Sequence, residues 1–126
     1  MTVGLSTTHA HAILNVYRGT TYTAPASVWL QLHTGDPGSA GTANASAETT
    51  RKQVTFAAPS AGSTTASAVS WTAWSAGTET ITHVSLHSAS SAGTFLQSGA
   101  LAASKTVNNG DTLNVTATAS QSPIAA

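Results

Sequence analysis

The chain has 126 residues, a length that suits one domain with a hydrophobic core. Only 6% of the residues are charged, against about 25% in typical globular proteins, and the four basic and four acidic side chains cancel. This composition argues against a nucleic-acid-binding surface, which needs clustered lysine and arginine, and no apolar run is long enough for a transmembrane helix. An uncharged surface is instead typical of a protein that packs against other subunits.

The first predicted element is a short helix at about residues 6–17. Its apolar side chains follow the spacing of a single helix face, made by Ala10, Ile13, Leu14 and Tyr17. Ser6, Thr7 or Thr8 can cap its start, and Gly19 suits its left-handed end. A helix of about a dozen residues is marginal by itself, so we expect it to dock on its own domain or on a neighbouring subunit.

The rest of the chain predicts short strands separated by glycine, serine, asparagine and proline. Apolar and polar residues alternate in SVWLQLH (27–33), QVTF (53–56), ASAVSW (66–71), THVSLH (82–87) and TLNVTA (112–117), and less regularly in TFLQSGAL (94–101). The segments 59–68 and 88–93 are predicted to be loops. The Asn-Gly pair in Asn108–Asp111 predicts a tight hairpin turn.

These elements predict an all-β fold, an antiparallel β-sandwich of jelly-roll or immunoglobulin-like type with one short N-terminal α-helix. We expect a single domain over residues 1–126, with an extended C-terminal tail at about residues 120–126.

Histidines are the most prominent reactive side chains, and His83 and His87 stand four residues apart. On a strand this spacing separates them by about 13 Å, too far to bind one metal ion. On a helix the spacing would suit a metal, but His83 lacks the following glutamate of the zinc-protease motif. We therefore expect both at the solvent or at a subunit interface, and we predict no metal or other cofactor.

The acidic and hydroxyl side chains form no recognisable catalytic pattern. Asp36 precedes Pro37 and Gly38, so we interpret it as a turn residue rather than a catalytic or calcium-binding group. The sequence holds no G-x-S-x-G nucleophile motif, no P-loop and no dinucleotide-binding motif. We expect no enzymatic activity.

The three tryptophans divide into one core residue and two interface candidates. Trp71 shares its strand face with Val69 and is predicted to lie in the core. Trp29 lies off the apolar face of its strand, and Trp74 would oppose Trp71 if that strand continued. The helix, a second sheet or another subunit would cover them, or they would stack on a sugar ring. The interface candidates from the whole sequence are Trp29, Trp74, His83, His87 and Asp36.

Five stretches occur in a characteristic order: GLSTTHAHAILNVYRGTTYTAPASVWLQLHTGDPG, AGTAN, RKQVTFAAP, ITHVSLHSASSAGTFLQSGAL and KTVNNGDTLNV. Together they resemble a family of small virion proteins of tailed bacteriophages, described as tail-fibre-like, minor tail or head-decoration proteins and marked by an L-H-T-x-D-P-G motif. The resemblance spans nearly the whole chain. Before its arginine the family has an E-[VL]-S-G-x-x-Y segment, where this chain has ASAETT.

This resemblance implies a structural virion protein without catalysis, made in the bacterial host cytoplasm. We expect it to decorate the capsid, bound to the major capsid protein and forming a homo-oligomer, without nucleic-acid or membrane partners. The first alternative is a minor tail or tail-fibre-associated protein that binds tail proteins. A further alternative is a carbohydrate-binding β-sandwich that uses Trp29 or Trp74.

Overall fold

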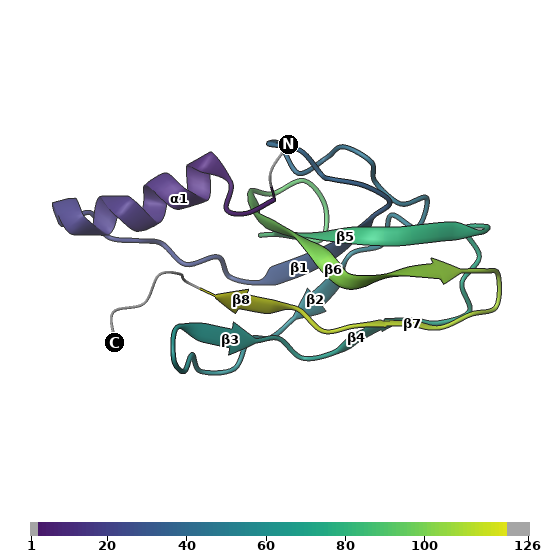
Figure 1. Ribbon diagram of the computed structural model, residues 1–126. Coiled ribbons are helices and arrows are strands. Elements are labelled where there is room, and N and C mark those ends of the chain that lie inside the picture. The colour runs from purple at the N-terminus through teal and green to yellow at the C-terminus, as the bar shows by residue number, and fades with distance from the viewer. Residues whose placement is uncertain (1–2, 121–126) are drawn as a thin grey trace.

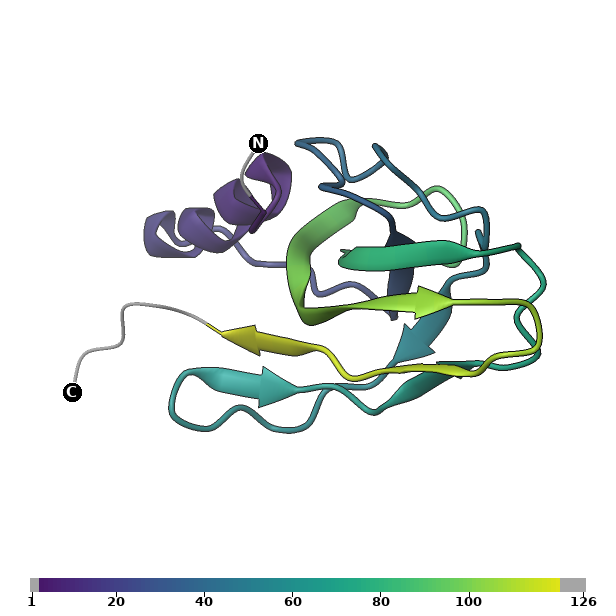
Figure 2. The same ribbon diagram turned by 45° about the vertical axis from the view of Figure 1, so that its right-hand side comes forward.

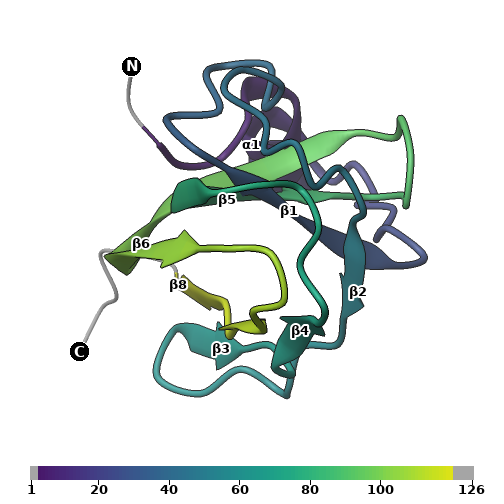
Figure 3. The ribbon, with the colours of Figure 1, turned by 90° about the vertical axis from the view of Figure 1, so that its right-hand side faces the viewer.

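Two layers of antiparallel strands face one another in the computed structural model, which describes residues 3–120 (Figures 1 and 3). The first layer is a four-stranded sheet in the order β2 (Lys52–Val54), β1 (Val28–His33), β5 (Glu79–His87) and β6 (Phe95–Val107). The second layer is a ribbon in which two pairs follow one another, β4 (Val69–Trp71) with β7 (Leu113–Val115) and β3 (Ser63–Thr65) with β8 (Thr118–Ser120). The predicted β-sandwich with an N-terminal helix is confirmed.

The core lies between these layers, where the alternating pattern of the strands predicts it. Leu30 and Leu32 of β1 are completely buried, and so is Ile81 of β5. The ribbon contributes apolar side chains from the opposite side, Val69, Trp71, Leu113 and Val115. Burial of this apolar surface is the main stabilising contribution to the fold.

The sandwich is closed along one side and open along the other. On the closed side the chain after β2 leaves β1 and pairs with the ribbon, because Ala57 donates its backbone N–H to Thr65 O and Ser67 donates to Thr55 O (3.1 and 2.8 Å). On the open side β6 is the edge of its sheet and pairs with neither β7 nor β8 (Figure 3). A cleft therefore remains between the two layers there.

Two local predictions are wrong. The segment 59–68, predicted to be a loop, contains β3, whose Ser-Thr-Thr sequence lacks an apolar alternation but pairs with β8 through the backbone. The NNGD turn does not join a hairpin, because β6 pairs with β5 and β7 pairs with β4. Only Gly110 of this turn has a positive φ, whereas the predicted turn type needs two such residues.

The N-terminal arm, residues 3–18, projects from one end of the sandwich (Figures 1 and 2). It contains α1 (Thr7–Leu14), capped by Ser6, and continues in the 3₁₀ helix η1 (Asn15–Arg18), which ends at Gly19 with φ 79°. Backbone hydrogen bonds tie its start to β6, from Ser6 N to Leu96 O and from Ser98 N to Gly4 O (both 2.8 Å).

None of the residues of α1 is fully buried: Ala10 and Ile13 of its apolar face are half-buried, whereas Leu14 is exposed. No helix in residues 3–120 is long and apolar enough to cross a membrane. The predicted tail beyond Ser120, residues 121–126, lies outside the described residues.

Candidate functional site

The face of the four-stranded sheet that points away from the core carries most of the polar side chains singled out in the sequence. Three pairs of opposite residues on β1 and β5 lie on this outer face: Trp29 and His87, Gln31 and Ser85, His33 and His83. The sequence predicts His83 and His87 at the solvent or at a subunit interface. In the single chain, His33, Ser85 and His87 are buried.

These three side chains form a hydrogen-bonded chain, the buried histidine network. His33 Nδ1 lies 2.8 Å from Ala43 O. A carbonyl oxygen can only accept a hydrogen bond, so Nδ1 carries the hydrogen and is the donor. In the neutral ring Nε2 is then the acceptor, and the Ser85 hydroxyl donates to it at 2.7 Å. His87 Nε2–H in turn donates to Ser85 Oγ at 2.9 Å.

Protonation of either imidazole in this network to its positively charged form is unfavourable. Burial lowers the pKa of His87 to about 4, with the positive charge of Arg51 and then His33 as further causes. Burial likewise lowers the pKa of His33, and the hydrogen bond to Ala43 O opposes this only in part. Both imidazoles are therefore neutral at pH 7, as the direction of the hydrogen bonds requires.

The loop of residues 34–50 covers the network, and it is held by its own side chains. Asp36 Oδ1 accepts a hydrogen bond from Gly38 N at 2.8 Å, so the interpretation of Asp36 as a turn residue agrees with the structure. Asn44 donates its side-chain amide to Asp36 O at 2.9 Å. Gly41, with φ 70°, lies so close to the Phe95 ring that a Cβ there would overlap it. The L-H-T-x-D-P-G stretch thus ends β1 and begins the covering loop, whose turn is held by hydrogen bonds within the loop.

The end of this loop is anchored on Glu79 at the start of β5. The carboxylate accepts hydrogen bonds from the Ser46 hydroxyl and from Ala47 N, the latter at 2.9 Å. Two hydrogen bonds to one side chain thus fix the end of the loop to the sheet.

A second loop, residues 88–94, is held by Arg51. Its guanidinium donates to Ala89 O and Ala92 O (both 2.8 Å) and, through Nε, to Gln31 Oε1 on the sheet (2.9 Å). The arginine of the RKQVTF stretch therefore joins one strand and one distant loop. A lysine, with a single ammonium group, could not reproduce this planar arrangement.

Of the five interface candidates, Trp29, His83 and His87 lie on the outer face and Asp36 lies in the loop over it, whereas Trp74 lies in the core. Trp74 and His87 are each only 2% exposed in the single chain, and their role at an interface stays a prediction. Trp74 packs in the core and donates its indole N–H to Gly77 O (2.7 Å). Trp29, His83 and Asp36 are partly exposed. Of the two tryptophans weighed for sugar binding, only Trp29 reaches the surface, and its indole N–H already donates to Ser27 Oγ at 2.8 Å.

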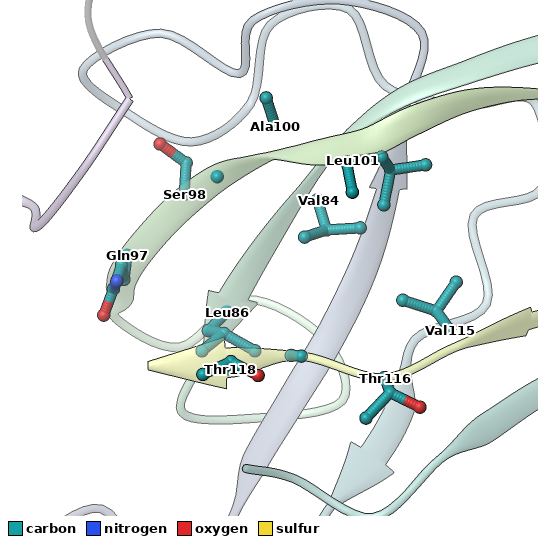
Figure 4. A pocket seen from close by; sticks show the side chains of 12 residues that line it. Val84, Leu86, Gln97, Ser98, Ala100, Leu101, Val115, Thr116 and Thr118 are labelled. Carbon is teal, nitrogen blue, oxygen red and sulfur yellow. The ribbon is translucent and has the colours of Figure 1, made fainter. Parts of the chain in front are cut away.

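The open side of the sandwich holds a cleft of about 140 Å³. Figure 4 shows Val84 of β5, Leu101 of β6 and Val115 of β7 around it. Its lining consists of apolar residues, small residues, threonines and one glutamine, without an acidic, basic or histidine side chain. Such a cleft can receive apolar groups, but it offers no group for acid–base chemistry.

Sequence reasoning missed Arg51, Ser85 and Glu79, which position the loops. A lone arginine, serine or glutamate carries no spacing signal, because its partners lie far away in the chain. Within residues 3–120 no group of three histidine, cysteine or acidic side chains is arranged to hold a metal ion. The outer face is thus a layer of fixed loops on a sheet, and the surface that it presents consists mainly of small uncharged residues.

Comparison with known proteins adds the family. A family model described as podophage GP4 fiber I protein gp80 matches residues 4–122, which include the arm, both layers and both covering loops. No curated protein matches the chain. The match supports the resemblance to phage tail-fibre-like proteins over nearly its full extent. The chain belongs to the family of podophage GP4 fiber I protein gp80.

Proposed function

We propose that this chain is a non-enzymatic structural subunit of a podophage tail fibre that binds other tail proteins. The observation that carries the proposal is the family match over residues 4–122, whose description is that of a fibre protein. Of the placements that the sequence left open, the tail-fibre-associated one accords with this description. The match offers no specific support for capsid decoration.

The chemistry of the site supports a structural role. A nucleophilic serine must present its hydroxyl oxygen to a substrate, but Ser85 is completely buried and its hydroxyl is engaged by two imidazoles. The histidines and Arg51 likewise spend their hydrogen bonds on loop backbone and on neighbouring side chains. These polar groups stabilise loops rather than form an accessible reactive centre.

Copy number and position on the virion test the proposal. Quantitative mass spectrometry of purified particles is expected to give at most tens of copies of the chain per virion. Gold-labelled antibodies against the chain are expected to mark the tail in electron micrographs. Hundreds of copies, with label spread over the head, would instead establish capsid decoration and overturn the tail placement.

A further inference from the structure

The N-terminal arm exposes large apolar side chains that its own domain leaves uncovered. Leu14 is 57% exposed, Val16 52% and Tyr17 89%. A single helical turn or two is not stable by itself in water, and the usual stabilisation is packing of an apolar face. Within residues 3–120 these three side chains therefore lack such packing, although Ala10 and Ile13 of α1 are half-buried.

A groove runs between this arm and the β3–β8 pair. It has a volume of about 310 Å³, with Leu5 and Ile13 of the arm on one side and Pro59 and Ala119 on the other. Figures 1 and 2 show the arm extending past the ends of β3 and β8, with the ribbon running apart from it. The far end of the arm, with η1, therefore lies beyond the ends of β3 and β8.

Neither surface carries the charge that would select a charged partner. The lining of the groove contains no acidic residue, lysine or arginine, and its one histidine, His9, has a pKa lowered by burial. The arm has one charged residue, Arg18, whose guanidinium donates to Asn15 Oδ1 within the same helical turn. The lack of charged residues in the lining favours an occupant with few charges, and the end of the arm offers the exposed apolar side chains Leu14, Val16 and Tyr17.

We propose that the end of the N-terminal arm of a second copy of this chain fills the groove. When the arm of each copy binds the groove of another copy, the contacts form a closed symmetric assembly. The exposed apolar side chains of every arm are then buried. The groove of about 310 Å³ has room for side chains from the end of the arm, where Leu14, Val16 and Tyr17 are exposed, rather than for the whole arm. The inference concerns the chain alone and does not depend on its place on the virion.

Disulfide trapping tests which surfaces meet, because the chain has no cysteine of its own. Two differently tagged single variants, Tyr17→Cys and Ser63→Cys, are mixed and mildly oxidised. The expected product is a covalent heterodimer, which can form only between chains. Ser63 lines the groove, whereas Thr112, exposed before β7 at the opposite end, serves as the matched control in a Tyr17→Cys and Thr112→Cys mixture. Equal yields in the two mixtures, or only Tyr17–Tyr17 dimers, would overturn the arm-in-groove contact.

Sedimentation of the purified chain supplies the second measurement. The wild-type chain is expected to sediment with the mass of two or more chains of 12.6 kDa each. Tyr17→Asp is expected to reduce the mass to that of one chain. Thr112→Asp introduces the same charge away from the groove and should leave the assembly intact. Circular dichroism verifies that both variants fold. A wild-type chain that remains monomeric at about 100 μM, a concentration at which even a weak specific contact would be seen, would overturn the proposal.

Discussion

The outer face of the four-stranded sheet and the N-terminal arm reverse the usual distribution of side chains. The sheet face buries polar groups, with His33 and Ser85 completely removed from solvent, while the arm exposes Leu14, Val16 and Tyr17. The difference lies in what covers each region. Two loops anchored by their own hydrogen bonds cover the sheet face, whereas no described segment covers these three side chains of the arm. Burial in this chain is therefore set by loops and partners as much as by residue type.

The largest effect is expected from a substitution in the covered region. His33→Ala removes the acceptor of the Ser85 hydroxyl and the donor to Ala43 O, and it leaves a cavity under the loop. We expect a loss of about 3 to 5 kcal/mol in the free energy of unfolding, measured by urea denaturation. His83→Ala is the control, because His83 is partly exposed and its imidazole bonds only to the adjacent Thr82. Equal losses in the two variants would contradict a structural role for the network.

The next effect tests whether the loop is packed closely on the sheet. Gly41→Ala would place a Cβ against the Phe95 ring at a positive φ, so we expect a loss of about 2 to 4 kcal/mol. Gly77→Ala is the matched control, since Gly77 also has a positive φ but no atom near its missing Cβ. It should cost about 1 to 2 kcal/mol. If thermal unfolding shows the two variants to be equally stable, the loop does not press on Phe95.

The two regions also differ in how far the sequence predicts them. Period-two alternation identifies Leu30 and Leu32 as core residues and assigns His33 to the other face, as the structure shows. Alternation distinguishes the two faces of a strand, but it does not say what covers the second face. The burial of His33 and His87 depends on loops whose anchors, Arg51 and Glu79, are distant in the chain.

The same limit explains the errors in the ribbon and the arm. β3 was missed because its strand character comes from backbone pairing with β8 and not from its Ser-Thr-Thr side chains. The periodicity of 6–17 predicts a helix with an apolar face, and the structure has α1 and η1 there. Periodicity alone could not say whether that face would be buried, because a partner chain leaves no pattern in the sequence.

A third prediction concerns pH and again acts on the covered region. The pKa values of His33 and His87 are lowered in the folded chain, for His87 to about 4, from about 6.5 in the unfolded chain. Below about pH 6.5 the unfolded chain therefore binds more protons, so stability falls as the pH falls and is fully present above that value. For His87 the slope stays below the limit of about 1.4 kcal/mol per pH unit for one proton, and it is steepest between its folded pKa of about 4 and its unfolded value.

Urea denaturation at about pH 7.5 and 5.5 measures this dependence. His87→Gln removes one of the two groups, so the difference in stability between the two pH values should be smaller for this variant than for the wild-type chain. The titration of groups outside the buried histidine network is common to both proteins and cancels in the comparison. An unchanged difference would mean that the pKa of His87 is not lowered in the folded chain.

The smallest effect on stability is expected from a substitution in the exposed end of the arm. Tyr17→Ser changes a side chain that is 89% exposed, so at high dilution it should alter the free energy of unfolding by less than about 0.5 kcal/mol. A partner that binds only the folded chain adds stability that grows with concentration. The wild-type chain should therefore gain thermal stability as its concentration rises, whereas Tyr17→Ser should gain little. A loss above about 1 kcal/mol at dilution would instead mean that Tyr17 packs on its own domain, and the arm would then belong with the covered region.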